Sequence, residues 1–276
     1  MYDKAAAFSN HDDLLIRTTD HPIIQPPQAH AKMEVEWIDN PAALKVFIDS
    51  IDKDSLLYVD LEGNNLSRRG TLSLVTIMVE PRHTVHLVDV TTLGKEAFTL
   101  LGTGGIALQD ILEAKEVTKI FFDIRNDSDA LFSLFGVRVG GIEDLQLMEL
   151  GTRASNRKLV QGLAKSIERD AKLSKADIKA WKEVKDAGKK LFAPELGGSY
   201  AVFDQRPLSA EVLQYSVQDV IHMPALRETY LGRLSQEWKD KVDVETVARI
   251  AESQSAGYDG QSREKVGGPK AWQTKK

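Results

Sequence analysis

The sequence predicts one α/β domain over about residues 34–238, and three observations lead to this prediction. Residues 33–38 alternate between apolar and polar side chains, as a half-buried strand does. Two β-rich runs, 72–79 and 85–90, are joined by the short turn 80–83, which is typical of a hairpin. After this hairpin, helical and strand patterns alternate along the chain, and such interleaving indicates a sheet packed against helices.

The first half of the domain is expected to contain a helix and a strand before the hairpin. Asn40 precedes Pro41, so a capping side chain stands before a proline at the first helical position, and apolar residues then recur at helical spacing. The next run, 56–63, is apolar until it ends in Asp60, Glu62 and a glycine. We expect this run to lie in one sheet with the two strands of the hairpin.

The second half alternates helices with one further strand. In order, we expect a helix at 106–114, a buried strand at 119–122, a helix at 128–135 that stops at Gly136, charge-rich helical segments over 157–191, and a helix that begins at Ser209 and runs through Asp219 towards Leu226. Gly197 and Gly198 break the chain before the last of these helices.

The two ends of the chain lack the sustained periodicity of the domain between them. Residues 1–33 hold Pro22, Pro26 and Pro27 among scattered polar residues, which predicts a flexible arm. Residues 239–276 are expected to form a C-terminal helix followed, from about residue 256, by a loose, glycine-rich and basic tail. If protein partners bind, the arm and the tail are the segments we expect them to use, although neither shows a readable motif.

The composition excludes several classes of function. The chain contains no cysteine, which excludes disulfides, thiolate zinc sites and cysteine nucleophiles, and which favours an intracellular, reducing compartment, cytoplasm or nucleus. No window approaches the roughly 18 apolar residues of a membrane span, and the N-terminal residues lack a secretory pattern, so no membrane association is predicted. The 36 basic and 41 acidic residues give a net charge of −5, so a nucleic acid would have to bind a local patch.

Two acids end an otherwise apolar strand. Asp60 and Glu62 are two residues apart, and side chains at i and i+2 of a strand point to the same face. Two unpaired carboxylates side by side repel each other, whereas a divalent cation removes that penalty because hard cations prefer carboxylate oxygen. A solvated strand end is the alternative interpretation of this pair.

Two further polar groups stand near the ends of expected elements. Residues 123–129 contain three aspartates and Arg125 between a strand and a helix, which is more acid than helix capping, the alternative interpretation, requires. Tyr215 and Asp219 are four residues apart and so share one helix face. Four carboxylates that converge from these places can hold two divalent ions about 3.5–4 Å apart, the arrangement used for in-line displacement at phosphorus.

These motifs, in this order, resemble those of DEDD-type 3′-5′ exonuclease domains of the ribonuclease D and Werner exonuclease superfamily, with the Egalitarian-like branch the most similar. The resemblance covers about residues 34–238 and implies a ribonuclease H-like fold, a mixed central β-sheet flanked by helices. It rests on Val-Asp-Leu-Glu-Gly at 59–63, on 123–131, on 214–220, and on Arg-Pro-Leu at 206–208.

The resemblance implies the roles of the site residues. Asp60, Glu62, Asp127 and Asp219 correspond to the metal ligands, and Asp127 is chosen because it lies five residues after Phe122, where many relatives have a histidine. Tyr215, four residues before Asp219, places the chain in the branch with a catalytic tyrosine. His222 follows Asp219, on the wrong side for the histidine of the other branch, and is expected to pack within its helix.

The substrate path is expected to follow basic residues. The stretch 164–192 holds nine basic and five acidic residues, and it can steer a phosphate backbone, although pairing on a solvated helix is the alternative. The expected substrate-binding residues are Lys189, Lys190 and Arg206 for phosphates, and Gly63, Asn64, Leu66 and Arg125 for the 3′-terminal nucleotide. For Leu66, core packing is the alternative interpretation.

The resemblance implies a metal-dependent 3′-5′ exonuclease that uses two Mg²⁺ or Mn²⁺ ions and releases nucleoside monophosphates from the 3′ end of single-stranded RNA or DNA, with RNA favoured. The alternative from another class is a non-catalytic RNA-binding or scaffold protein that retains the exonuclease fold. Against this alternative, binding alone has no use for a cluster of acids, which repels phosphate unless metal fills it. A ribonuclease H-like endonuclease is disfavoured because the Tyr215–Asp219 spacing suits the exonuclease branch.

Overall fold

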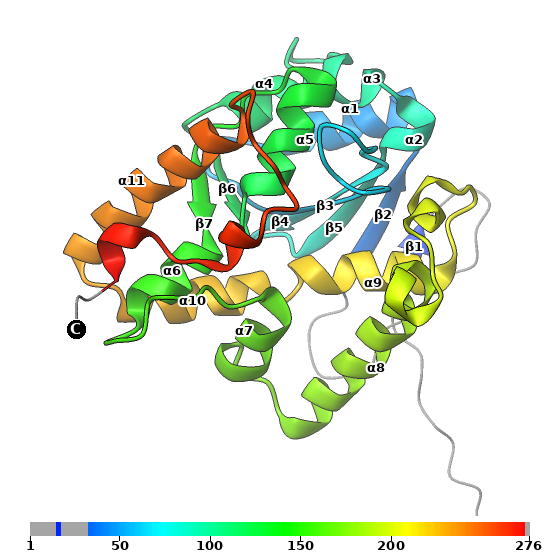
Figure 1. Cartoon of the computed structure of the whole chain (residues 1–276). Helices are drawn as coiled ribbons and strands as arrows, with labels where there is room; N and C mark the ends of the chain where they lie inside the picture. The colour runs from blue at the N-terminus through cyan, green and yellow to red at the C-terminus, as the bar shows by residue number, and fades with distance from the viewer. Residues whose placement is uncertain (1–14, 18–32, 274–276) are drawn as a thin grey trace, which may run out of the picture.

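A seven-stranded sheet lies at the centre of the computed structural model, which describes residues 15–17 and 33–273 (Figure 1). The strands are β1 (Leu15–Arg17), β2 (Glu34–Ile38), β3 (Leu56–Glu62), β4 (Leu74–Glu80), β5 (Thr84–Asp89), β6 (Thr118–Phe121) and β7 (Ile142–Asp144). Their order in the sheet is β1-β2-β5-β4-β3-β6-β7. The β3–β4 and β4–β5 pairs are antiparallel and the other pairs are parallel, so the predicted hairpin and its sheet are confirmed.

The helices cover both faces of this sheet. They are α1 (Pro41–Ser50), α2 (Val90–Leu93), α3 (Glu96–Thr99), α4 (Leu108–Glu113), α5 (Arg125–Phe135), α6 (Leu145–Thr152), α7 (Leu163–Asp170), α8 (Lys175–Phe192), α9 (Ala210–Val220), α10 (Met223–Arg233) and α11 (Gln236–Ser253). One apolar core joins the sheet to α1 to α5, and a second joins its opposite face to α6 to α10. None of the helices that the structure describes is long and apolar enough to cross a membrane.

Strand β3 contributes to both cores because its side chains alternate. Leu57, Val59 and Leu61 belong to the first core, whereas Tyr58 belongs to the second. Asp60 and Glu62 continue the alternation on the side of Tyr58, where α9 crosses β3 and β4. The period of the strand therefore aims both acids at the helix that carries Asp219.

The helical boundaries differ from the sequence-based expectation in three places. The helix expected from Ser209 towards Leu226 is divided into α9 and α10, with Pro224 in the first turn of α10. The charge-rich segment is two helices, and Ser174 caps the second of them by accepting a hydrogen bond from the Asp177 N–H. Helix α5 begins at Arg125, before the expected start, so it includes Asp127 in its first turn.

The N-terminal arm was predicted over residues 1–33, and most of that prediction lies outside the described residues. Within the arm, the structure places Leu15–Arg17 as strand β1, which pairs in parallel with β2 at the edge of the sheet. Three residues are too few to show a period, so the sequence pattern did not reveal this strand.

The C-terminal tail is not loose over the part that the structure describes. After α11, residues 256–273, here called the C-terminal strap, run back along α5 and α6 (Figure 1). Trp272 is buried and packs edge-on against Trp238, with ring centroids 5.3 Å apart. Gly267 pairs with Leu159, and the guanidinium of Arg68 donates to the carbonyl of Ala256. Composition suggested disorder, but buried aromatic side chains anchor this segment instead.

A buried ion pair joins α11 to the carboxyl end of the sheet. Arg249, 3% exposed, donates to the carboxylate of Asp144 at 2.7 Å, and Asp144 is fully buried. Asp144 also accepts from the backbone N–H groups of Gln146 and Leu147, so it caps α6. Because Asp144 also accepts from the backbone N–H groups of Asp123 and Ile124, this pair couples the C-terminal helix both to α6 and to the loop that leads into α5.

We expect Arg249→Leu to destabilise the protein by about 3–5 kcal/mol, because it leaves the Asp144 charge buried without its partner. Urea unfolding followed by circular dichroism measures this loss. Lys241→Met is the control, since Lys241 pairs with Glu237 on the surface of the same helix and should change stability by no more than about 0.5 kcal/mol. A loss of less than about 1 kcal/mol for Arg249→Leu would contradict the expected role.

Candidate metal and catalytic site

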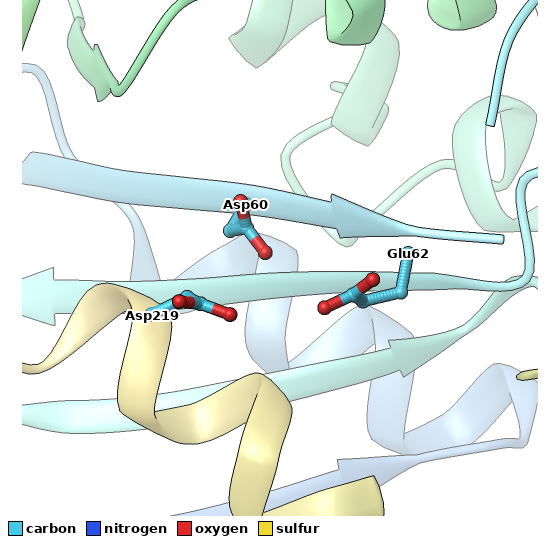
Figure 2. Close-up of side chains that lie close together, drawn as sticks. All are labelled: Asp60, Glu62 and Asp219. Carbon is cyan, nitrogen blue, oxygen red and sulfur yellow. The ribbon is translucent and has the colours of Figure 1, made fainter. Parts of the chain in front are cut away.

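Three carboxylates from two elements meet over the end of β3. Figure 2 shows Asp60 and Glu62 on the strand and Asp219 on α9, with their carboxylates turned towards one another. One oxygen from each of the three lies within 4.8 Å of the others. These three residues are called the acidic centre below. Its oxygen-only donor set matches the preference of a hard divalent cation.

Asp127 lies beside the acidic centre rather than within it. It is buried in the first turn of α5 and is not one of the three closely spaced carboxylates. Burial, and after it the charge of Asp123, raises the pKa of Asp127 to about 8. Asp127 in turn raises the pKa of Asp60. The structure therefore brings together three of the four predicted carboxylates and places the fourth nearby.

The acidic centre is electrostatically unfavourable without a cation. Burial raises the pKa of Asp60 well above its usual range, and Asp219 and Glu62 raise it further. The pKa of Glu62 is raised in the same way, first by burial and then by Asp219. The hydroxyl of Thr76, opposite Asp60 on β4, is buried and has no hydrogen-bond partner among the described residues. Crowded carboxylates beside an unsatisfied hydroxyl fit a divalent ion with its bound water.

Tyr215 projects from α9 one turn before Asp219. Its ring packs edge-on against Phe192 of α8, with centroids 4.8 Å apart. Burial raises the pKa of Tyr215 well above its usual range, and the negative charges of Asp219 and Glu62 raise it further. The hydroxyl therefore keeps its proton at neutral pH and is available as a hydrogen-bonding group beside the acids.

Lys185 of α8 is a site residue that the sequence analysis did not single out. Its ammonium donates to both carboxylate oxygens of Asp219, at 2.6 Å each. The sequence shows Lys185 as one of many basic residues in a charge-rich helix. The available signal was its spacing from Trp181, since residues four apart share a helix face and Trp181 is buried.

Both arginines among the expected substrate-binding residues, Arg206 for phosphate and Arg125 for the 3′-terminal nucleotide, are occupied within the protein. The guanidinium of Arg206 binds both carboxylate oxygens of Asp89, at 2.8 and 2.6 Å, and donates to the carbonyl of Ser73. Arg125 is 6% exposed and is held by Asp123 and by the carbonyl of Lys265. Neither guanidinium is presented to a nucleotide. That of Arg206 is bound by partners distant in the sequence, and that of Arg125 is buried and bound within the protein.

The other expected substrate-binding residues divide by exposure. Lys189 and Lys190 are exposed at the end of α8, and Lys189 lies 3.9 Å from Glu195. Leu66 is partly buried against the first core, in agreement with the packing alternative. Asn64 is half-buried in the loop after β3, and its backbone N–H donates to Thr71.

The surroundings of Gly63 and of His222 indicate a packing role for each residue. A Cβ at position 63 would collide with the backbone carbonyl of Thr71, so glycine permits the two ends of the loop between β3 and β4 to approach each other closely. His222 lies edge-on to Trp181, with ring centroids 6.3 Å apart, which agrees with the expected packing role.

Comparison with known families and proteins gives three findings. A family model described as 3′-5′ exonuclease matches residues 35–229. The piRNA biogenesis protein EXD1 of Mus musculus is 34% identical over 100 residues, which cover 36% of this chain and 16% of the relative. The Homo sapiens protein of the same name is 33% identical over 100 residues, 36% of this chain and 18% of the relative. The matched segment thus spans less than a fifth of these relatives.

Solved structures with the same fold include two complexes of Trypanosoma brucei RNase D. The GMP complex superimposes with a TM-score of 0.70 at 22% identity, covering 86% of this chain and 70% of that chain. The complex with RNA U12 has a TM-score of 0.69 at 22% identity and covers 86% and 77%. Brucella melitensis NrnC with bound Mg²⁺ has a TM-score of 0.56 at 17% identity and covers 84% and 98%. These likenesses confirm the predicted fold, a mixed sheet flanked by helices.

Proposed function

The chain belongs to the 3′-5′ exonuclease family, and on that premise we propose that it hydrolyses single-stranded RNA from the 3′ end with two divalent ions, Mg²⁺ or Mn²⁺, at the acidic centre. The observation that carries the proposal is the meeting of Asp60, Glu62 and Asp219 within 4.8 Å. Bringing these carboxylates together lowers the stability of the folded state. Binding of a divalent cation offsets this repulsion, which is a physical reason for their arrangement.

The residues present fit a divalent ion, and their roles follow from their positions. Asp60, Glu62 and Asp219, with Asp127 beside them, would hold the two ions. When bound, such ions lower the pKa of a water molecule and stabilise the charge that develops on the leaving oxygen. The protonated hydroxyl of Tyr215 would orient an attacking water molecule towards phosphorus. Water adds to phosphorus as the bond to the 3′ oxygen breaks, which releases a nucleoside 5′-monophosphate and leaves a new 3′ hydroxyl.

RNA is proposed as the substrate on the basis of the similar proteins. The solved neighbours include RNase D complexes with an RNA and with GMP, and the relatives similar in sequence are piRNA biogenesis proteins. Lys189 and Lys190, exposed at the end of α8, would attract the phosphate backbone. The competing function is an RNA-binding adaptor without turnover, and the acidic centre speaks against it because it repels phosphate when no cation is bound.

A time course on a denaturing gel tests the proposal. The substrates are 5′-labelled single-stranded RNA, its DNA counterpart and a circular RNA, each with Mg²⁺, Mn²⁺ or EDTA. We expect the linear RNA to shorten stepwise from its 3′ end with either ion, and the circle to stay intact. Uncut RNA in every lane, with a shift on a native gel, would favour the adaptor. Cleavage of the circle would identify an endonuclease.

A further inference from the structure

Lys185 reaches the acidic centre because α8 approaches α9 closely at one point. A Cβ at Gly188 would lie 2.6 Å from the Cβ of Tyr215, so only glycine allows this approach without a shift. Lys185 lies one turn before Gly188, and its side chain is 14% exposed. The close contact of the two helices therefore directs Lys185 inwards.

The ammonium of Lys185 binds two groups of the site at once. It lies 2.6 Å from each carboxylate oxygen of Asp219 and 3.1 Å from the centroid of the Tyr215 ring. It therefore occupies both oxygens of a carboxylate that also belongs to the acidic centre. The same charge lowers the pKa of Asp60 and of Glu62, so its effect extends over all three acids.

The other ion pairs of α8 lysines are different in kind. Lys179 and Lys182 are exposed, and their acidic partners are Glu183 at 3.8 Å and Glu168 at 3.0 Å. Such surface pairs contribute little and are screened by salt. Lys185, in contrast, is largely shielded from water, where a charge acts on its neighbours more strongly.

We propose that Lys185 is a functional residue of the acidic centre, which competes with the divalent ion for Asp219 and, when the ion displaces it, binds a phosphate oxygen of the substrate. The proposal rests on the proposed function in that it takes Asp219 as a metal ligand. An ammonium and a divalent ion beside the same carboxylate repel each other, so binding of the ion weakens the hold of Lys185 on Asp219. The displaced ammonium stays tethered beside the site, where a phosphodiester is the anion available to pair with it.

Two effects of opposite sign distinguish this role from simple damage to the site. Lys185→Met removes the charge but keeps an unbranched side chain, so it should bind Mn²⁺ at least about tenfold more tightly than the wild type, a change of about 1.4 kcal/mol. The same variant should bind single-stranded RNA several-fold more weakly in Ca²⁺, the ion chosen for the binding assay. A disordered site would instead weaken both.

Isothermal titration with Mn²⁺ alone gives the first measurement, and fluorescence anisotropy with labelled RNA gives the second. Lys185→Arg keeps the charge and should stay near the wild type in both assays. Lys179→Met is the control for net charge, since it removes an exposed lysine from the same helix and should leave Mn²⁺ affinity unchanged. Unchanged or weaker Mn²⁺ binding by Lys185→Met would overturn the proposal.

Asp219→Asn separates this proposal from the proposed function. If Asp219→Asn binds Mn²⁺ as tightly as the wild type, Asp219 is not a metal ligand, and both proposals fail at that residue. If Asp219→Asn weakens Mn²⁺ binding while Lys185→Met does not tighten it, only the role of Lys185 is overturned.

Discussion

Asp60→Asn is expected to abolish nucleotide release without loss of the fold. Asp60 interacts with every other acid of the site, since Asp219, Glu62 and Asp127 each raise its pKa. The amide carries no charge to hold an ion. Loss of a residue that only hydrogen-bonds to a metal ligand lowers activity roughly 10- to 100-fold, so loss of the ligand itself should lower activity by more than that. Release of mononucleotides from labelled RNA measures the loss, and a variant with more than a tenth of wild-type activity would contradict the assignment.

The same substitution should make the metal-depleted protein more stable. A carboxyl whose pKa is raised on folding binds more protons in the folded state, so it lowers stability as pH rises above its ordinary value. At pH 7 in EDTA, we expect Asp60→Asn to gain about 0.5–2 kcal/mol over the wild type in urea unfolding. The gain should shrink as the pH falls and be lost below the ordinary pKa of 3.8, where the wild-type carboxyl is mostly protonated in both states. A loss of stability at pH 7 would show that Asp60 has a structural role instead.

Tyr215→Phe is expected to lower kcat by about 100-fold and to change RNA affinity by less than about twofold. The ring packs against Phe192, and phenylalanine keeps that contact. Only the hydroxyl is lost, and because its pKa is raised by burial and by the nearby acids, it acts as a neutral hydrogen-bonding group. Single-turnover rates and RNA anisotropy in Ca²⁺ separate the chemical step from binding.

Tyr230→Phe provides the matched control for this experiment. Tyr230 of α10 is buried against α7, and its hydroxyl lies 3.4 Å from the Asp170 carboxylate. Tyr230→Phe therefore removes the same hydroxyl oxygen as Tyr215→Phe, but in another part of the protein. The control should keep its turnover rate. Equal losses of rate and affinity in Tyr215→Phe would argue against a role for the hydroxyl in the chemical step.

Local patterns were sufficient to predict five of the seven strands, β2 to β6, and the faces that carry Asp60, Glu62 and Asp219, whereas the three-residue strands β1 and β7 were not predicted. The apolar alternation of β3 places Asp60 and Glu62 on one face, and the spacing from Tyr215 places Asp219 on one face of α9. Both features depend only on the period of the element that contains them, and such a period is visible in the sequence.

Long-range pairs account for what could not be predicted. Arg206 pairs with Asp89, which is 117 positions away in the chain, and nothing in its local sequence distinguishes an occupied arginine from a free one. Lys185 likewise reaches Asp219 only because α8 packs closely against α9 at Gly188, and this contact cannot be read from the sequence of α8. Residues 256–273 looked loose because their composition is polar and rich in glycine, whereas a few buried aromatic side chains determine where they pack.

Residues of the C-terminal strap lie outside the region that the family model matches, yet they contact the candidate site. Tyr258 and Lys265 both donate to the side chain of Asn126, the immediate neighbour of Asp127, while the family match ends at residue 229. A substitution in the strap can therefore alter the placement of a motif acid while every motif residue stays the same. The surroundings of the candidate site therefore include a segment that a comparison of the motifs alone leaves out.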